Sequence, residues 1–219
     1  MRAMILSGAD RYSDPWHPFP RTSKLIAQTL VDAGIETTIR EDTDSALASL
    51  DGVELLVVNT GHPWRDRPER LPADAPGRAG LRIALGRGIG VLAMHTAIAS
   101  LRDYPEWATA TGAIWIPGAS GHPPLGPTII RGGELPDGAR IEDFAVSDER
   151  YGGLQFVGHS HVVAHHEGSA GLEPTAWVRD LGPSRIAVDL LGHDERSYES
   201  AGHRTLLLEL ASWAAAPHQ

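Results

Sequence analysis

The chain of 219 residues contains no cysteine and no long run of apolar residues. The missing cysteine excludes disulfides, thiolate metal ligands and a cysteine nucleophile, and it suits a reducing cytoplasm. The missing apolar run excludes a membrane-spanning helix. The N-terminal stretch reaches Asp10 after only a few apolar residues, which predicts a first strand and not a signal peptide. We therefore expect a cytoplasmic protein.

Positive charge is also scarce, because 19 basic residues face 28 acidic ones and Lys24 is the only lysine. The net charge of -9 argues against nucleic acid or an anionic membrane as a partner. Apolar residues make up 42% and charged residues 21%, a mixture typical of a folded globular chain rather than a disordered one. The length predicts a single domain over residues 1–219.

What the chain does contain is a regular alternation of strand-like and helix-like segments in its first hundred residues. Near-continuous apolar runs are typical of strands buried on both faces of a parallel sheet. The alternation predicts a βαβ series, hence a mostly parallel sheet with right-handed crossovers. Strands are expected at 3–8, 35–41, 53–61 and 89–95, and helices at 21–34, 43–50 and 75–88.

The second half begins with a turn-rich segment, residues 112–161, in which the pattern predicts short strands at 127–131 and 141–146. We interpret it as a loop-rich flap within the domain and not as a separate domain. The closing part of the chain predicts three further strands and a helix. The strands are expected at 161–167, 174–181 and 185–194, and the helix at 198–215.

Histidines follow four of the expected strands: His17, His62, His95 and His193. The carboxyl ends of strands are where open α/β sheets hold their functional sites. One interpretation is a single cleft lined by imidazoles and tryptophans. The other is that loops are polar and that histidine is common in a chain with 11 of them.

Several known motifs are absent or incomplete. The glycine-rich stretch 86–90 precedes its strand, so it predicts a helix-to-strand turn rather than a phosphate loop. The chain has no P-loop, no H-E-x-x-H and no G-x-S-x-G elbow. His159 and His161 share one face of an extended segment but lack a third metal ligand. In the segment SDERYGG, Glu149 and Tyr151 share a face and are candidates, whereas Asp148 is interpreted as a solvated loop residue.

Three ordered stretches carry a resemblance to a known family: GVLAMHTAIASLRDYPEWATATGAIWIPGASGHPP, IEDFAVSDERYGG and PTAWVRDLGPSRIAVDLLGHD. Together with PWHPF near the start and HRTLLLELASWA near the end, they resemble the ThuA-like (trehalose-utilisation) family over nearly the whole chain. Members of that family are similar in fold to class I glutamine amidotransferases. The resemblance implies a flavodoxin-like, doubly wound and mostly parallel sheet with helices on both faces.

The resemblance also implies a site. His95 takes the elbow position where amidotransferases carry the nucleophilic cysteine, and His193 takes the late-strand histidine position, so thioester chemistry and glutaminase activity are not expected. What remains is acid–base chemistry on a sugar or keto-sugar, with His95 as base or acid, Glu149 and His193 as counterparts, and Asp194 orienting His193. The expected walls of the carbohydrate site are Trp16, His17, Trp64, His122 and Tyr151.

Two alternatives stay open at this point. The chain is either such an enzyme or a non-catalytic module that binds a sugar or a partner protein. A third hypothesis is compatible with either alternative: three or more of His17, His95, His122 and His193 could bind a divalent metal. No other cofactor is expected. A homo-oligomer is compatible with the sequence. The flap carries a geometric prediction: His122 and Glu149 should lie on the same side of the sheet as His95 and His193.

Overall fold

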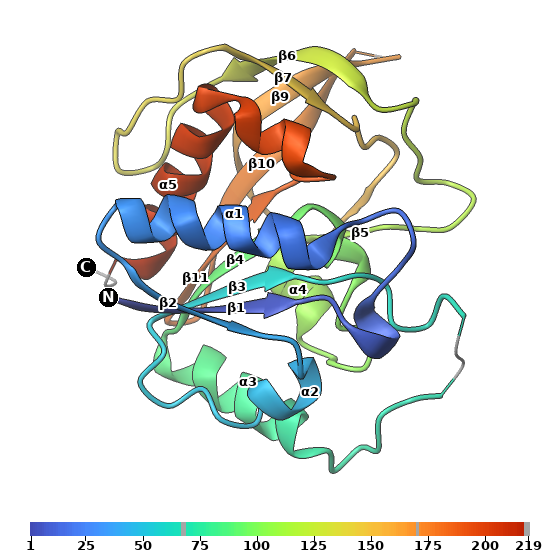
Figure 1. The fold of residues 1–219 in the computed structure, drawn as a ribbon, viewed down its shortest axis with the longest axis vertical. Coiled ribbons are helices and arrows are strands. Elements are labelled where there is room, and N and C mark those ends of the chain that lie inside the picture. The colour runs from blue at the N-terminus through green and yellow to red at the C-terminus, as the bar shows by residue number, and fades with distance from the viewer. Residues whose placement is uncertain (67–68, 170, 217–219) are drawn as a thin grey trace.

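The computed structural model describes residues 1–66, 69–169 and 171–216. Within them, nine strands form one continuous sheet (Figure 1). Its strands are β1 (Arg2–Ser7), β2 (Glu36–Arg40), β3 (Leu55–Asn59), β4 (Gly90–Met94), β6 (Gly126–Gly132), β7 (Phe144–Asp148), β9 (His161–Gly168), β10 (Gly171–Leu181) and β11 (Ser184–Asp189). Their order across the sheet is β2-β1-β3-β4-β11-β10-β9-β6-β7.

The sheet has a parallel half and an antiparallel half. Strands β2, β1, β3, β4 and β11 pair in parallel, and β3 and β4 are buried at every position, as their apolar runs predict. The order 2-1-3-4 followed by β11 is that of flavodoxin-like folds, which confirms the predicted fold class. Strands β10, β9, β6 and β7 extend the sheet in antiparallel pairs.

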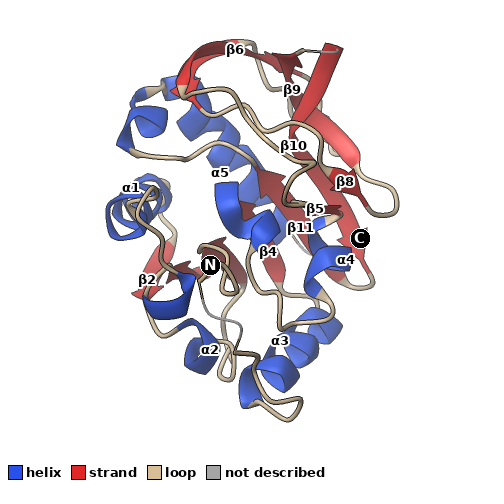
Figure 2. Cartoon of the chain, turned by 90° about the vertical axis from the view of Figure 1, so that its right-hand side faces the viewer, coloured by secondary structure: helices blue, strands red, loops and turns tan. Residues whose placement is uncertain are grey.

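Helices cover both faces of the sheet (Figure 2). On one face, α1 (Phe19–Asp32) and α5 (Ala201–Ala215) bury Ile26 and Leu210 in a core that continues under the antiparallel half. On the other face, α2 (Thr43–Ala46), α3 (Pro76–Arg87) and α4 (Trp107–Thr111) bury Leu81 and Trp107. Apolar residues spaced three or four apart place one stripe of each long helix against the sheet.

Some element boundaries differ from the sequence-based expectation. Helix α1 begins at Phe19 rather than at residue 21, because a proline fits the first helical turn, where no backbone donor is needed. Helix α2 ends at Ala46, and of the four residues expected to continue it, Leu47 and Ala48 form a turn and the next two have no regular structure. The small sheet of β5 (Ala113–Ile114) and β8 (Gln155–Phe156) was not expected.

The turn between α3 and β4 confirms the interpretation of the glycine-rich stretch 86–90. Gly88 has φ of 94° and caps the helix in the left-handed conformation that only glycine adopts without strain. Gly90 lies so close to α5 that a Cβ atom there would be 2.5 Å from the Ala214 carbonyl oxygen. Both glycines bring the start of β4 tightly under the closing helix.

The turn-rich segment 112–161 is part of the sheet as well as a cover for it. Its strands β6 and β7 form the far edge, while backbone bonds of 3.1 and 2.8 Å join Gly121 and Gly152 in the two loops before and after them. These loops carry His122 and Glu149 to the strand ends described below. No helix in the described part of the chain has the length and apolar character needed to cross a bilayer.

Candidate functional site

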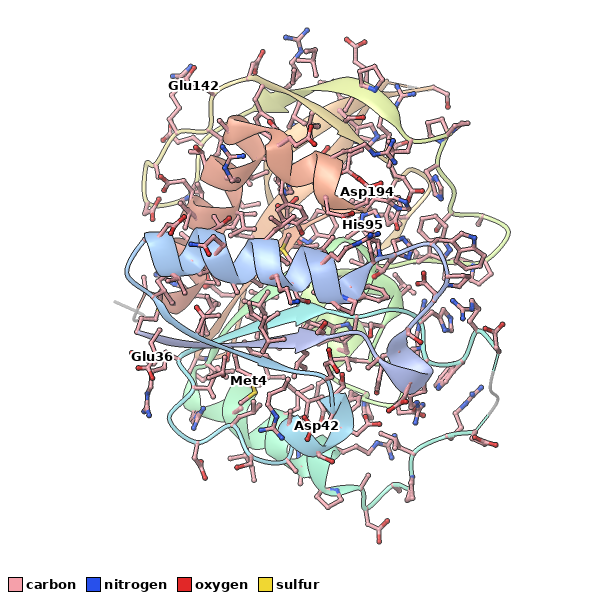
Figure 3. All side chains as sticks on the ribbon, viewed as in Figure 1. Met4, Glu36, Asp42, His95, Glu142 and Asp194 are labelled. Carbon is pink, nitrogen blue, oxygen red and sulfur yellow. The ribbon has the colours of Figure 1, made fainter. Side chains whose placement is uncertain are left out.

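The candidate site lies where the parallel strands end. Short 3-10 helices follow three of these strands: η1 (Asp10–Tyr12) after β1, η2 (His95–Ala99) after β4 and η3 (Glu195–Glu199) after β11. His17 follows η1, His95 is the first residue of η2, and His193 precedes η3. Figure 3 shows His95 and Asp194 on the side toward which the arrowheads of β1 and β3 point.

His95 occupies a strained elbow. Its φ of 45° lies in the left-handed region, which is costly for any residue other than glycine, and its side chain is 1% exposed. In the neutral ring, Nδ1 donates to the Leu190 carbonyl oxygen at 2.7 Å and Nε2 carries the lone pair. Nε2 accepts from the Tyr151 hydroxyl at 3.0 Å. Strain kept at a buried polar residue is a mark of functional sites.

The elbow leads to a stability prediction. Both His95→Ala and His95→Gly remove the same ring, but alanine keeps the left-handed strain, whereas glycine does not. We expect His95→Gly to be the more stable of the two by about 1 kcal/mol, which reverses the usual order of these residues. Urea unfolding of both variants, followed by circular dichroism, measures the difference; equal stabilities, or a more stable alanine variant, would show that the elbow is unstrained.

Four side chains converge at the elbow. His17, His95, Glu149 and His193 each offer one ligand atom, and all four atoms lie within 4.8 Å of one another. Glu149 is central, since its Oε2 is 3.2 Å from His193 Nδ1 and 3.4 Å from His95 Nε2. Its Oε1 is 3.4 Å from Nδ1 of the partly exposed His122. Of the two side chains that the flap was expected to carry to this side of the sheet, Glu149 therefore reaches His95 and His193, and His122 reaches Glu149.

His17 is oriented by a carboxylate that precedes it in the chain. Its Nδ1 lies 2.7 Å from both Asp14 carboxylate oxygens, so this nitrogen donates and Nε2 is left as the acceptor. The ring centroid is 5.0 Å from that of His95 and 4.7 Å from that of His193. Asp14 was not among the expected site residues. Its signal is the turn-forming Asp-Pro step, in which the carboxylate also accepts from the backbone of Trp16 and His17.

The electrostatics of the cluster are set by one carboxylate among imidazoles. Burial by itself would raise the pKa of Glu149, but the imidazoles of His193 and His95 outweigh it and hold that pKa well below its ordinary value. Burial would lower the pKa of His95, but the carboxylates of Glu149 and Asp148 raise it. Burial dominates at His17 and lowers its pKa. Burial, with the carboxylates of Glu149 and Asp148, raises the pKa of Tyr151 well above its usual range.

Asp148 corrects a sequence-based interpretation, because it is fully buried and not a solvated loop residue. Its carboxylate accepts from the backbone N–H of Gly192 at 2.7 Å, of Glu149 at 2.8 Å and of His193 at 3.3 Å. The hydroxyl of Ser197 is a fourth donor. Asp148 thus ties the end of β7 to the loop after β11, and two of the residues that it holds carry cluster side chains.

Three of the expected site residues do not join the cluster. Trp16 is 62% exposed and stacks with the Arg65 guanidinium, so it forms no wall. Trp64 donates through Nε1 to Asp103 at 3.1 Å, which directs its ring to a different loop. The carboxylate of Asp194 accepts from Arg196 and caps η3, so Glu149 and not Asp194 contacts the His193 ring.

The aromatic wall of the cluster comes from the flap. Tyr151 is 5% exposed, and its ring centroid is 4.6 Å from that of His95 and 4.7 Å from that of Trp115. Trp115 also faces His122, with centroids 6.0 Å apart. These rings close the side of the cluster that faces β5 and leave His17, His193 and His122 as its partly exposed side chains.

A cleft of about 790 Å³ lies beside the cluster. His122 belongs to both, because it lines the cleft and contacts Glu149. The other lining residues combine small, charged and hydrogen-bonding groups: Ala119, Gly121, Pro123, Arg150, Gly152, Gly153, His166, Glu167, Gly168, Ser169 and Glu173. The volume is within the range of small-molecule sites. A ligand in the cleft could therefore reach the cluster past His122.

Fold and site together define a flavodoxin-like α/β protein with a histidine-rich centre at its strand ends and a histidine at the elbow. The chain belongs to the ThuA family, described as trehalose utilisation, whose model matches residues 2–214. The family supports a carbohydrate-related role. No curated protein gave a significant match to this sequence.

Solved structures show the same fold. A ThuA-like protein from Parabacteroides merdae is 18% identical with a TM-score of 0.76, and the match covers 100% of this chain and 91% of that one. A ThuA-like protein from Bacteroides uniformis is 13% identical with a TM-score of 0.69, covering 98% and 90%. PurLQS from Thermotoga maritima is 13% identical with a TM-score of 0.58, covering 97% and 98%. At these identities, the matches establish the fold alone.

Proposed function

We propose that this ThuA-family chain is a cytoplasmic enzyme of carbohydrate metabolism that transfers protons at a sugar or keto-sugar bound next to the His95 elbow. The observation that carries the proposal is the buried contact series Tyr151–His95–Glu149–His193, with neighbouring atoms 3.0 to 3.4 Å apart. Buried titratable groups in mutual contact beside a cleft are typical of catalytic centres.

The chemistry follows from what each group can do. A carbon next to a sugar carbonyl loses its proton when a base accepts it and a donor stabilises the oxygen. The Tyr151 hydroxyl can donate, and the imidazoles and the Glu149 carboxylate can accept. His122, which lines the cleft, offers a polar edge to a sugar there, and the Trp115 ring lies behind it with ring centroids 6.0 Å apart. The same groups would serve isomerisation or cleavage of a keto-sugar derivative.

Glutaminase chemistry is not part of the proposal. The elbow carries an imidazole, and the chain has no cysteine that could form a thioester. The strained elbow favours an enzyme over a passive binding module, and so does Glu149 Oε2, which forms no hydrogen bond within the described residues. Both features cost stability without adding contact area.

The test uses untagged protein and keto-disaccharides, including oxidised trehalose, in deuterium oxide. Proton NMR reports exchange at the carbon next to the carbonyl as well as new products. We expect both from the natural chain, and we expect Tyr151→Phe and Glu149→Gln to lower the rate by about 10²- to 10⁴-fold. His159→Ala, which replaces an exposed histidine away from the cluster, is the matched control and should be unchanged.

Two results would overturn the proposal. One is binding of the sugar, seen by calorimetry, with neither exchange nor product; this would establish the binding module. The other is exchange that survives both cluster substitutions, which would place the chemistry elsewhere.

A further inference from the structure

We infer that His17, His95, His193 and Glu149 form a binding site for one divalent first-row transition-metal ion. Their ligand atoms lie within 4.8 Å of one another although they come from three strand ends and the flap. The inference does not depend on the substrate being a sugar. In this inference the three histidines and Glu149 coordinate an ion, whereas in the proposed function they transfer protons.

The first argument is that polar atoms in the cluster lack partners. His17 Nε2, His193 Nδ1 and Glu149 Oε2 are buried and form no hydrogen bond within the described residues. Although Glu149 Oε2 is only 3.2 Å from His193 Nδ1, the pair does not meet hydrogen-bond geometry. Burying such atoms unsatisfied is costly. A single cation placed among them would satisfy all three.

The second argument is the outer contacts of the rings. Histidines that bind metals donate their other ring nitrogen to a carboxylate or a backbone carbonyl, which fixes the tautomer. His17 does this with Asp14 at 2.7 Å, and His95 does it with the Leu190 carbonyl at 2.7 Å. Both rings therefore present Nε2 as a lone pair. Among the described residues, His95 Nε2 is hydrogen-bonded to the hydroxyl of Tyr151 alone, and a hydroxyl can rotate to another acceptor.

Protonation offers a poorer solution than a metal ion. The Nδ1 protons of His17 and His95 are already engaged, so a proton on each Nε2 would make two imidazolium rings with centroids 5.0 Å apart. Glu149 is the one carboxylate among the four described ligand groups, and Asp14 faces His17 only from its Nδ1 side. Like charges at that distance in a buried site disfavour each other. One ion coordinated by neutral rings avoids the conflict.

The donor set indicates the class of ion. Three imidazole nitrogens and one carboxylate suit zinc, iron, nickel and related ions, whereas magnesium and calcium prefer oxygen ligands throughout. A bound ion would act as a Lewis acid toward a carbonyl or hydroxyl oxygen of a ligand. Tyr151 is then the group beside His95 that remains able to deliver a proton.

The experiment measures metal content and affinity independently of turnover. The chain is purified without a histidine tag, analysed for transition metals, stripped with a chelator and titrated with Zn²⁺ by calorimetry and with Co²⁺ by visible absorption. We expect one ion per chain, with Co²⁺ bands that report bound imidazole nitrogen. His17→Ala, His193→Ala and Glu149→Gln should each weaken Zn²⁺ binding by at least about 100-fold.

Asp14→Asn tests the outer contact separately. It leaves all four ligands in place but replaces the carboxylate that orients His17, so affinity should fall by about 10- to 100-fold. His159→Ala, an exposed histidine outside the cluster, should bind as the natural chain does. Circular dichroism melting confirms that each variant is folded; any ligand variant that does not fold is replaced by its His→Gln or Glu→Ala counterpart.

The outcomes separate this inference from the proposed function. A stoichiometric ion lost on ligand substitution supports the site, even if no sugar is turned over. Turnover by chelated, metal-free protein would leave the proposed function standing and refute a catalytic ion. Failure of Zn²⁺ and Co²⁺ to bind, or binding that the ligand substitutions leave unchanged, would overturn the inference.

Discussion

Replacing Asp148 by alanine is expected to lower the free energy of unfolding by about 3 to 5 kcal/mol. The carboxylate is fully buried and accepts from three backbone N–H groups and the Ser197 hydroxyl. Each buried donor that loses its acceptor costs about 1 to 3 kcal/mol, and the sum is reduced by local relaxation. The loss is therefore large for a single polar side chain.

Asparagine is not expected to rescue the position. Asp148→Asn keeps the shape of the side chain but turns one acceptor into a donor, which would face donors of the loop after β11. Urea unfolding of both variants measures the effect, with the fully exposed Asp51→Ala as the control that should match the natural chain. An Asp148→Ala variant as stable as this control would show that the contacts of Asp148 add nothing.

Replacing Asp148 should also disturb the candidate metal site. Asp148 holds the backbone of Glu149 and His193, whose side chains meet in the cluster. In a variant that still folds, both side chains lose their fixed positions. Affinity for Zn²⁺, measured as above, should therefore fall in Asp148→Asn although no proposed ligand has been changed.

The strand ends were predictable from the sequence because the buried strands are near-continuous apolar runs. The run in 89–95 marks where β4 stops, just before His95. Strand β11 stops at Asp189, before the expected end at 194, and His193 follows after a short loop. The convergence of these histidines follows from the parallel order of the sheet. Placing Glu149 and His122 at the site required a further hypothesis, namely that the turn-rich segment folds toward the carboxyl ends of the parallel strands.

The misplaced residues share a physical cause. Composition indicates that a segment is polar but not which donors will surround it. Asp148 therefore looked solvated, although the distant loop after β11 brings three of the four donors to its carboxylate. Trp16 and Trp64 looked like walls because tryptophan often stacks on sugars. Their positions were decided instead by partners in other loops, Arg65 for Trp16 and Asp103 for Trp64.

Below the site, a buried ion pair joins β11 to α5. His203 Nε2 and Asp189 Oδ2 are 3.0 Å apart, and both side chains are fully buried. Burial would lower the pKa of His203, but the Asp189 carboxylate outweighs it and raises that pKa. The other ring nitrogen, Nδ1, is hydrogen-bonded to the Ser197 hydroxyl at 2.9 Å, and this hydroxyl in turn donates to Asp148. The pair therefore supports the loop that carries His193.

Replacing His203 by alanine should lower the free energy of unfolding by about 3 to 5 kcal/mol at pH 6, because Asp189 is left as a buried and unpaired charge. Asp189→Asn should cost less, since it leaves a neutral amide next to a ring that can lose its proton. The Asp189→Asn, His203→Ala double variant should cost less than the sum of the single changes, since the two residues interact directly. Urea unfolding of the four chains gives the coupling energy.

The contribution of the His203–Asp189 pair to stability should depend on pH with a definite sign. A raised pKa in the folded state means that folding favours the protonated ring, so the contribution is fully present below the unfolded value of about 6.5. It is lost as the pH rises through the raised folded value. The stability gap between the natural chain and His203→Gln, a neutral side chain that can still donate to Asp189, should therefore be widest at mildly acid pH and narrow toward alkaline pH. A gap that widens as the pH rises would mean that His203 is neutral in the fold and that its bond to Asp189 carries no ionic component.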